Sequence, residues 1–280
     1  MKKFNRVNLS GRLAGYELNR GTTKNGDDFI NGTISLIVDE NGTTVDKIRV
    51  FATPVWKKSG KANGNYTMLD KMEQGEFQVG ADNGEWLAIQ GTIDISYFPP
   101  RNPDPNDPEP ARSQRVNATF INANTKKAYQ NTWSCDYLMT NIREIEADPE
   151  RNLDRYVRVH GYVVDEYNEV VLEAEFDVRK EAAINYFLGL QASEDMPYFV
   201  SVGGEMTMVV RSVTIPNAIG DDEHREFTNL RWCVTRINPT PYTFGDEADI
   251  TVDQYNEFKA NLQEKKAEAM KDDKEPDLAF

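Results

Sequence analysis

The stretch FINGTISLIVDENGTTVDKIRVFA, residues 29–52, decides the fold class of this chain. On both sides of DENG, apolar residues occupy alternate positions, as in β-strands with one buried and one wet face. Asn41 and Gly42 between them favour a tight hairpin turn, because both residues tolerate positive backbone angles. The stretch therefore predicts an antiparallel hairpin with strands over 29–38 and 43–52.

Three further stretches, residues 7–18, 86–98 and 133–145, show the same alternation. A helical pattern, YTMLDKMEQG, lies between the third and fourth of the resulting five strands. Five strands with a helix between the third and fourth is the order of an OB-fold, a β-barrel that leaves few open edges. We therefore predict a mainly β protein in which residues 1–147 form an OB-fold barrel and 133–145 supply its fifth strand.

Three pairs of stretches indicate a second copy of this barrel. They are RVNLSGR (6–12) with YVRVHGY (156–162), WLAIQGTIDI (86–95) with FVSVGGEMTM (199–208), and YLMTNI (137–142) with WCVTRI (232–237). Their common order predicts two OB-fold barrels in tandem, the second an atypical, OB-like domain over residues 148–245. After EVVLEAEFDV the chain passes straight into the helical stretch EAAINYFLGLQ, so we expect one strand of this copy to be missing or displaced.

Residues 246–280 are expected to form a C-terminal helix and a flexible acidic tail. Thr251 and Gln254 have the spacing of a capping box. The residues that follow place an apolar stripe on one helix face, namely Tyr255, Phe258 and Leu262. Pro276 cannot continue the helix, so the last residues should form a mobile tip.

The net charge of −14 is unevenly distributed, with +5 over residues 1–71 and −12 over 144–226. This polarity suggests one surface that attracts polyanions and another that repels or mimics them. No stretch is long and apolar enough to span a membrane, and we expect a cytoplasmic protein with no membrane partner. Cys135 and Cys233 fit neither a disulfide framework nor a zinc site.

The sequence offers little for catalysis. His160 and His224 are the only histidines, and neither has a serine or cysteine neighbour that would suggest a triad. The acidic run at 221–223 is better explained as a solvated hairpin tip than as a metal site. We therefore predict a binding protein rather than an enzyme, with no cofactor and no metal.

Cations and aromatic residues gather where OB-folds bind their ligands, on strands two and three and on the flanking loops. Such a mixture suits single-stranded nucleic acid, because bases stack on rings and phosphates pair with cations. The candidates in the first loop and around the third strand are Arg20, Lys24, Lys47, Arg49, Phe51, Trp56, Lys57, Lys58 and Lys61. The alternative for this stretch is a solvated strand end with Trp56 in the core.

A proline-rich loop, residues 99–114, forms a second candidate region. It holds six of the chain's thirteen prolines and should be extended and exposed. At its roots stand the further candidates Tyr97, Phe98, Arg101, Arg112 and Arg115. The loop could fold over a bound strand, or it could be an insertion that touches nothing, since acidic residues at its tip would repel phosphate.

The tip DDKEPDLAF, with its acidic residues and terminal aromatic, resembles the C-terminal tip of bacterial single-stranded DNA-binding proteins and the acidic ends of phage ones. The resemblance implies that Phe280 fills an apolar pocket on a replication or recombination protein. Leu278 would be a secondary contact, and the acidic face would comprise Asp272, Asp273, Glu275 and Asp277. The tip departs from the family pattern because Lys271 and Lys274 dilute its charge and no Gly- and Gln-rich linker precedes it.

Together these features favour a phage-type single-stranded DNA-binding protein that acts without sequence specificity in DNA replication, recombination and repair. A second copy of the chain, in a homo-oligomer, is a further expected partner. Its setting would be the cytoplasm of a bacterial host. The acidic tail could also compete with DNA for the basic groove. Two alternatives remain open: a virion assembly protein built from β-barrels, and an inhibitor that mimics DNA with residues 144–226.

Overall fold

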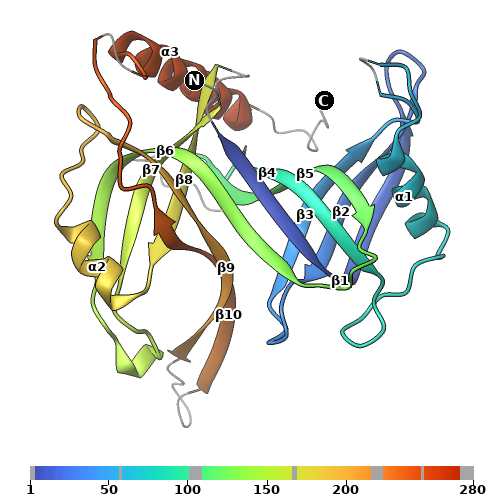
Figure 1. Ribbon diagram of the computed structural model, residues 1–280, viewed down its shortest axis with the longest axis horizontal. Coiled ribbons are helices and arrows are strands. Elements are labelled where there is room, and N and C mark those ends of the chain that lie inside the picture. Colours follow the sequence, from blue (N-terminus) through green and yellow to red (C-terminus); the bar gives the residue numbers. More distant parts are fainter. Residues whose placement is uncertain are drawn as a thin grey trace.

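The chain folds into two β-barrels that lie next to each other, with a long helix across the top (Figure 1). The computed structural model describes residues 4–56, 59–100, 109–165, 169–215, 223–246 and 249–271, without the side chains of residues 214, 215, 223 and 224. Within these ranges, no helix combines the length and the apolar composition of a membrane span.

The first barrel is an OB-fold. Its elements are β1 (Asn5–Thr22), β2 (Asp28–Ile37), β3 (Thr44–Ala52), α1 (Gly64–Glu73), β4 (Trp86–Phe98) and β5 (Ala111–Ala123). The strands close in the order β1-β2-β3-β5-β4 and back to β1, with β3 and β5 parallel and the other neighbours antiparallel. The hairpin between β2 and β3, predicted from Asn41 and Gly42, is confirmed, and Gly42 has a φ of +81°.

The second barrel repeats this order. Its elements are β6 (Gln130–Ile145), the short helix η1 (Pro149–Arg151), β7 (Tyr156–Asp165), β8 (Val170–Val178), α2 (Glu181–Leu188), β9 (Tyr198–Ile215) and β10 (Glu223–Ile237). The strands close as β6-β7-β8-β10-β9 and back to β6, again with the third and fifth strands parallel. The prediction of a mainly β fold with two OB-fold barrels in tandem is confirmed.

The two first strands join the barrels. β1 pairs with β6 in antiparallel register from Asn5 opposite Cys135 to Ser10 opposite Gln130, so that the strands form one continuous sheet. The backbone N–H of Phe4 donates to the Asp136 carboxylate at 2.9 Å and extends this junction. The relative placement of the barrels is thus fixed by backbone pairing.

The prediction that 133–145 is the fifth strand of the first barrel is wrong. β5 fills that place, because it pairs with β4 over its whole length and meets β3 at Asn117. The sequence disguised β5, since it follows the prolines directly and most of its residues are polar. The stretch 133–145 lies in β6, the first strand of the second barrel, so no strand of that barrel is missing. We therefore propose that the first domain ends in the turn 124–129 rather than at residue 147.

One of the three repeat pairings is confirmed. WLAIQGTIDI lies in β4 and FVSVGGEMTM in β9, the fourth strands of their barrels. Gly91 and Gly204 hold the same place in them: a Cβ at Gly91 would overlap the Asn117 carbonyl of β5, and one at Gly204 the Cys233 carbonyl of β10. The other two pairings are wrong, because they align first with second strands and first with fifth strands.

Helix α3 (Val252–Lys271) packs on β8 of the second barrel and on β4 of the first. The predicted capping box is confirmed: Thr251 Oγ1 accepts from the Gln254 N–H at 3.2 Å, and Gln254 Oε1 accepts from the Thr251 N–H at 3.1 Å. The apolar stripe predicted for this helix is buried, as expected. α3 therefore spans the junction between the barrels.

Both cysteines are free and buried, Cys135 in β6 and Cys233 in β10. Burial raises the pKa of each thiol. Within the described ranges, no group of three or more histidine, cysteine or acidic side chains could hold a metal ion.

Candidate nucleic-acid interface

An aromatic pair lies on the outer face of β2 and β3. Along β3, Ile48 and Val50 are buried in the core, whereas Arg49 and Phe51 point outward, because successive side chains of a strand alternate. The ring of Phe51 lies 5.5 Å, centroid to centroid, from the ring of Phe29 in β2. The structure thus places the predicted Phe51 beside a second ring on the strand pair that usually contacts the ligand in OB-folds.

Two arginines flank one carboxylate on the same face. Arg49 Nη1 lies 3.7 Å and Arg115 Nε 3.9 Å from Asp94 Oδ2. Arg115 also donates to the hydroxyl of Ser96, and burial lowers the pKa of its guanidinium. With two cations around one carboxylate, this trio keeps a net positive charge.

A second aromatic pair joins Trp56 to Phe120 of β5, at a centroid distance of 5.9 Å. Phe120 is 46% exposed. A tight turn holds Trp56, whose N–H donates to the Lys61 carbonyl and whose carbonyl accepts from the Gly60 N–H, both at 2.8 Å. Gly60 has a φ of +64°, which glycine adopts at little cost. Trp56 is therefore held against β5 and does not belong to the buried core.

Helix α1 fixes the part of β5 that carries Phe120. Asn65 Nδ2 donates to the Thr119 carbonyl at 2.8 Å, and Asn65 Oδ1 accepts from the Ile121 N–H at 2.9 Å. These bonds flank the β-bulge where the register of β4 against β5 shifts. The Asn65 amide thus replaces ladder bonds that a bulge interrupts, and it keeps Phe120 pointing outward.

Three of the predicted lysines are exposed around this face. Lys24 lies in the loop between β1 and β2, Lys47 in β3, and Lys61 in the turn after β3. Lys47 has a φ of 55° next to the register shift between β2 and β3. All three side chains are open to solvent.

Arg20 lies at the same end of the barrel but is engaged by α1. Its guanidinium binds the carboxylates of Asp70 and Glu73, and Nη1 donates to the Tyr66 hydroxyl at 3.1 Å. The hydrogen bonds that Arg20 donates to Asp70 and Glu73 raise its pKa. Arg20 therefore joins β1 to α1, and we do not count it among the candidate residues for binding phosphate.

The roots of the proline-rich loop point in another direction, toward the second barrel. Arg112 forms ion pairs with Glu173 at 3.0 Å and with Glu175 at 2.5 Å, both on β8. Tyr97 packs under a lysine of α3, and burial raises the pKa of its phenol. Phe98, at the end of β4, is exposed. Of the predicted residues at this loop that the structure describes, Phe98 alone has an exposed side chain.

Several predicted residues lie outside the part of the chain that the structure describes. They are Lys57, Lys58 and Arg101, together with the tail residues Asp272, Asp273, Glu275, Asp277, Leu278 and Phe280. Their roles remain predictions from the sequence.

Sequence reasoning missed Phe29, Asp94 and Phe120. The signal for Phe29 was available, since it alternates with the core residue Ile30 and must therefore point outward. Phe120 was hidden because its strand, β5, is not among the strands that the sequence pattern predicts. We define the binding face by its six members, Phe29, Arg49, Phe51, Trp56, Arg115 and Phe120.

The comparisons with known proteins address the fold around this face. A family model, YorF, matches residues 3–276. The chain belongs to the YorF family. No curated protein matches the sequence of this YorF chain.

Two solved structures are similar to the YorF chain in fold. One is a deletion mutant of the single-stranded DNA binding protein from Thermus aquaticus, with a TM-score of 0.51 and 14% identity over 88% of this chain and 98% of that chain. The wild-type protein from the same organism gives a TM-score of 0.49 and 14% identity over 86% of this chain and 95% of that one. At this identity, the likeness to the first structure establishes the arrangement of the barrels and nothing about residues.

Proposed function

We propose that the chain binds single-stranded DNA without sequence specificity on the binding face of the first barrel. The observation that carries the proposal is that one ring of each aromatic pair, Phe51 or Phe120, lies on the strand that carries Arg49 or Arg115. Rings of this kind stack with any base, since every base has a π-face, and each stacking contact contributes about 1–3 kcal/mol. The fold likeness to a protein named for single-stranded DNA binding supports this choice of ligand.

The cations would hold the strand by its phosphates. Arg49 shares β3 with Phe51 and Arg115 shares β5 with Phe120, and both guanidiniums lie near Asp94. Each phosphate that they neutralise releases condensed counterions, so affinity should fall with salt with a slope of about −0.7 per contact. Because no base edge needs to be read, the preference among sequences should be weak.

We further propose that this binding protects exposed strands during DNA replication, recombination and repair. The acidic C-terminal tip would recruit replication or recombination proteins through Phe280. This part of the proposal rests on the sequence of the tip and its resemblance to the tips of single-stranded DNA-binding proteins.

Titration with fluorescent oligo-dT of increasing length tests the central proposal. We expect tight binding at low salt, a steep loss of affinity with added salt, and quenching of Trp56 fluorescence. Absence of binding at low salt would overturn the proposal and favour a virion component or a DNA mimic. The same titration without residues 272–280 tests the tail: if the tail competes with DNA, its removal raises affinity at low salt, and unchanged affinity excludes that competition.

A further inference from the structure

The second barrel has a net negative sequence but carries four arginines close together on its outer surface. We call these residues the arginine cluster: Arg158 of β7, Arg179 after β8, Arg211 of β9 and Arg231 of β10. Three of them surround Tyr156, which is 1% exposed. Because four separate segments contribute one arginine each, the cluster is a product of the fold and not of a basic run in the sequence.

Tyr156 organises the cluster. Its hydroxyl accepts from Arg158 Nη2 at 3.1 Å and from Arg211 Nη2 at 3.2 Å. The guanidinium carbons of Arg179 and Arg158 lie 4.4 Å and 5.4 Å from the centre of its ring. These contacts hold the arginines in place without cancelling their charge, since a phenol is neutral.

Carboxylates balance only part of this charge. Asp177 lies 3.0 Å from Arg158 and 3.1 Å from Arg179. Glu175 lies 3.9 Å from Arg158, but Arg112 of the first barrel binds it more closely. Four guanidiniums thus face two carboxylates, one of which is shared with another cation.

Arg231 is the least compensated member of the cluster. Among the described residues, no carboxylate forms an ion pair with it, and its buried Nε has no hydrogen-bond partner. Burial lowers the pKa of its guanidinium, and the charge of Arg158 adds to this effect. Holding an unpaired, partly desolvated cation beside other cations costs free energy, and an anion bound in front of it would offset that cost.

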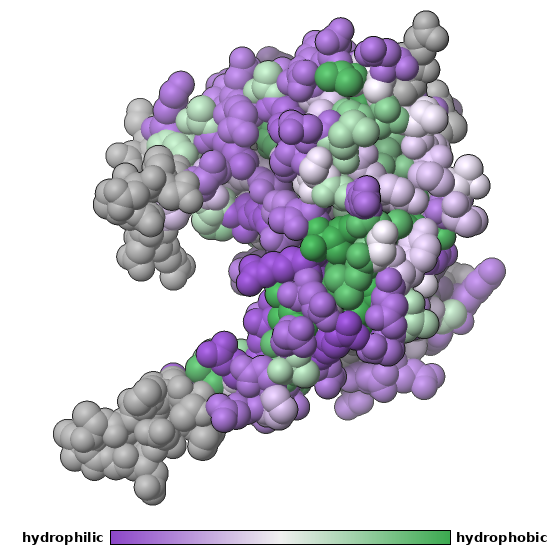
Figure 2. Space-filling view, turned by 90° about the vertical axis from the view of Figure 1, so that its left-hand side faces the viewer, coloured by the Kyte–Doolittle hydropathy of each residue, from purple (hydrophilic) through white to green (hydrophobic). Residues whose placement is uncertain are grey.

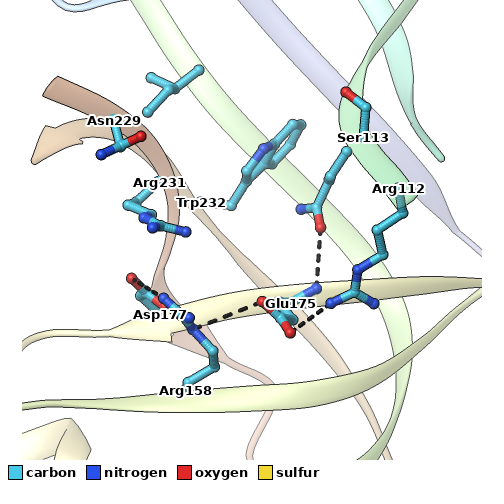
Figure 3. Close-up of a pocket in the computed structure, with 10 residues that line it drawn as sticks. Arg112, Ser113, Arg158, Glu175, Asp177, Asn229, Arg231 and Trp232 are labelled. Atoms are coloured by element: carbon cyan, nitrogen blue, oxygen red, sulfur yellow. Dashed lines mark hydrogen bonds and ion pairs between the residues drawn. The ribbon is translucent and has the colours of Figure 1, made fainter. Parts of the chain in front are cut away.

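Two members of the cluster, Arg158 and Arg231, line a cavity between the barrels. The cavity has a volume of about 460 Å³, and β5 of the first barrel forms one wall while β7, β8 and β10 of the second form the others. Figure 3 shows Arg158, Arg231 and Asp177 on one side of it and Arg112 and Ser113 on the other. Seen from the side of the second barrel, the molecule is hollowed and the hollow is lined mostly by hydrophilic residues (Figure 2).

The strand β5 connects this cavity to the binding face. Ser113 lines the cavity, and Arg115 belongs to the binding face. Residues two apart in a strand point to the same side, about 7 Å from each other. A nucleic-acid strand that leaves Arg115 along β5 therefore meets the cavity next.

We propose that the arginine cluster is a second phosphate site, which takes the phosphodiester backbone of a DNA strand as it passes from the first barrel to the second. The inference rests on the proposed function, because the strand must first occupy the binding face. It explains why four arginines converge on the more acidic barrel. It also gives the inter-barrel cavity a ligand of defined chemistry, a phosphodiester.

The test compares two oligo-dT lengths on the full chain. One oligonucleotide of about 8 nucleotides fits the site of a single OB-fold, and one of about 35 exceeds it. With Arg231→Gln we expect affinity for the long oligonucleotide to fall about 5- to 10-fold at low salt. Its salt slope should decrease by about 0.7, the contribution of one phosphate. Affinity for the short oligonucleotide should not change.

Two further variants make the test specific. Lys265→Gln removes a cation from the exposed face of α3 and should leave both oligonucleotides bound as in the wild type. Asn229→Glu keeps all four arginines but adds a negative charge on the same side of β10 as Arg231, where it would repel a phosphate, and it should weaken only the long oligonucleotide. Asn229→Glu decides the question if Arg231→Gln does not fold.

Each other outcome overturns the inference. Equal loss for both lengths in Arg231→Gln would mean that Arg231 acts through the binding face or the fold. Unchanged binding of the long oligonucleotide in both cavity variants would show that the strand does not use the cavity. Binding of inorganic phosphate by the wild type but not by Arg231→Gln, with unchanged oligonucleotide binding, would make the cluster a site for free anions. If the wild type binds neither oligonucleotide, the proposed function itself fails.

Discussion

The third strands of the two barrels hold the same place in the fold but present opposite charges. β3 in the first barrel turns Arg49 and Phe51 outward, whereas β8 in the second turns Glu173, Glu175 and Asp177 outward. The inward residues of both strands are apolar and buried. The barrel therefore depends on the inward positions, and the outward positions are free to take different partners.

The outer faces of β3 and β8 also contact different parts of the molecule. On the outer face of β3, Arg49 pairs with Asp94 of the same barrel, but the outer face of β8 meets the first barrel through Arg112 and meets α3 through Lys266, whose Nζ lies 3.0 Å from Glu173. His160 lies between the two glutamates, 3.4 Å from Glu173 and 3.2 Å from Glu175. We call these five residues the inter-barrel ion network. Acidic residues of the second barrel thus serve to join the two domains.

The comparison predicts that exposed rings matter for DNA on the first barrel and not on the second. Phe120→Ala should lower affinity for oligo-dT about 10- to 100-fold, because stacking with one base contributes about 1–3 kcal/mol. Trp56 remains in this variant, so its fluorescence still reports binding. The measurement is the titration described above.

Tyr186→Ala is the matched control. Tyr186 lies on α2 of the second barrel and is 45% exposed, nearly the same as Phe120. We expect wild-type affinity in this variant. A similar loss in both variants would remove the distinction between the barrels.

Much of the fold could be predicted from local alternation and turn chemistry. The hairpin at Asn41 and Gly42 and the helix that begins after Thr251 follow from short-range rules, and both are confirmed. The assignment failed at β5 and β6. The alternation in β6 is compatible with a strand of either barrel. Its pairing with β1, β7 and β9 assigns it to the second barrel, and such long-range pairing cannot be predicted from alternation.

The site was less predictable than the fold. Phe51 and Trp56 were identified because they follow a strand pattern next to lysines, but their ring partners lie on other strands. Arg20 and Arg112 were predicted to bind nucleic acid because they stand beside loops. The carboxylates that form ion pairs with them are distant in the sequence and could not be foreseen from it. The arginine cluster was missed because its members are separated by at least twenty residues and each stands in an acidic or neutral context.

The inter-barrel ion network predicts a pH dependence for stability. Hydrogen bonds to Glu173 and Glu175 raise the pKa of His160 from its ordinary value of 6.5 to about 9, despite burial and the nearby Arg112, which lower it. A raised pKa means that the protonated histidine stabilises the folded state fully below pH 6.5. This stabilisation is lost as the pH rises toward 9.

Thermal unfolding checks this expectation. Between pH 6 and pH 9 the Tm of the wild type should fall by roughly 2–4 °C more than the Tm of His160→Gln. In a protein of this size, this difference corresponds to about 1 kcal/mol of unfolding free energy. The expected difference in Tm is small because His160 is partly exposed and solvent screens its charge. Parallel pH profiles for the two proteins would show that the network contributes nothing through His160.

The smallest effect on oligo-dT affinity is expected at a feature that both barrels share, a carboxylate between two arginines. Asp94 of the first barrel and Asp177 of the second each lie near two guanidiniums, but Asp177 is 3% exposed and Asp94 25%. Asp94→Asn should therefore leave the fold intact and remove the negative charge that lies between Arg49 and Arg115, which favours phosphate. Because exposed ion pairs are worth about 0–1 kcal/mol, we expect oligo-dT affinity to rise no more than about 5-fold.

The control for this prediction is Asp82→Asn, which makes the same change of net charge at an exposed turn before β4. If both variants bind DNA more tightly by the same factor, the gain comes from net charge, and Asp94 does not restrain the two arginines. A loss of affinity in Asp94→Asn alone would have the opposite meaning: the carboxylate would position Arg49 and Arg115 for the strand. Asp94 would then resemble Asp177, which holds the guanidiniums of Arg158 and Arg179 in place, and the two barrels would use one device for presenting arginine to phosphate.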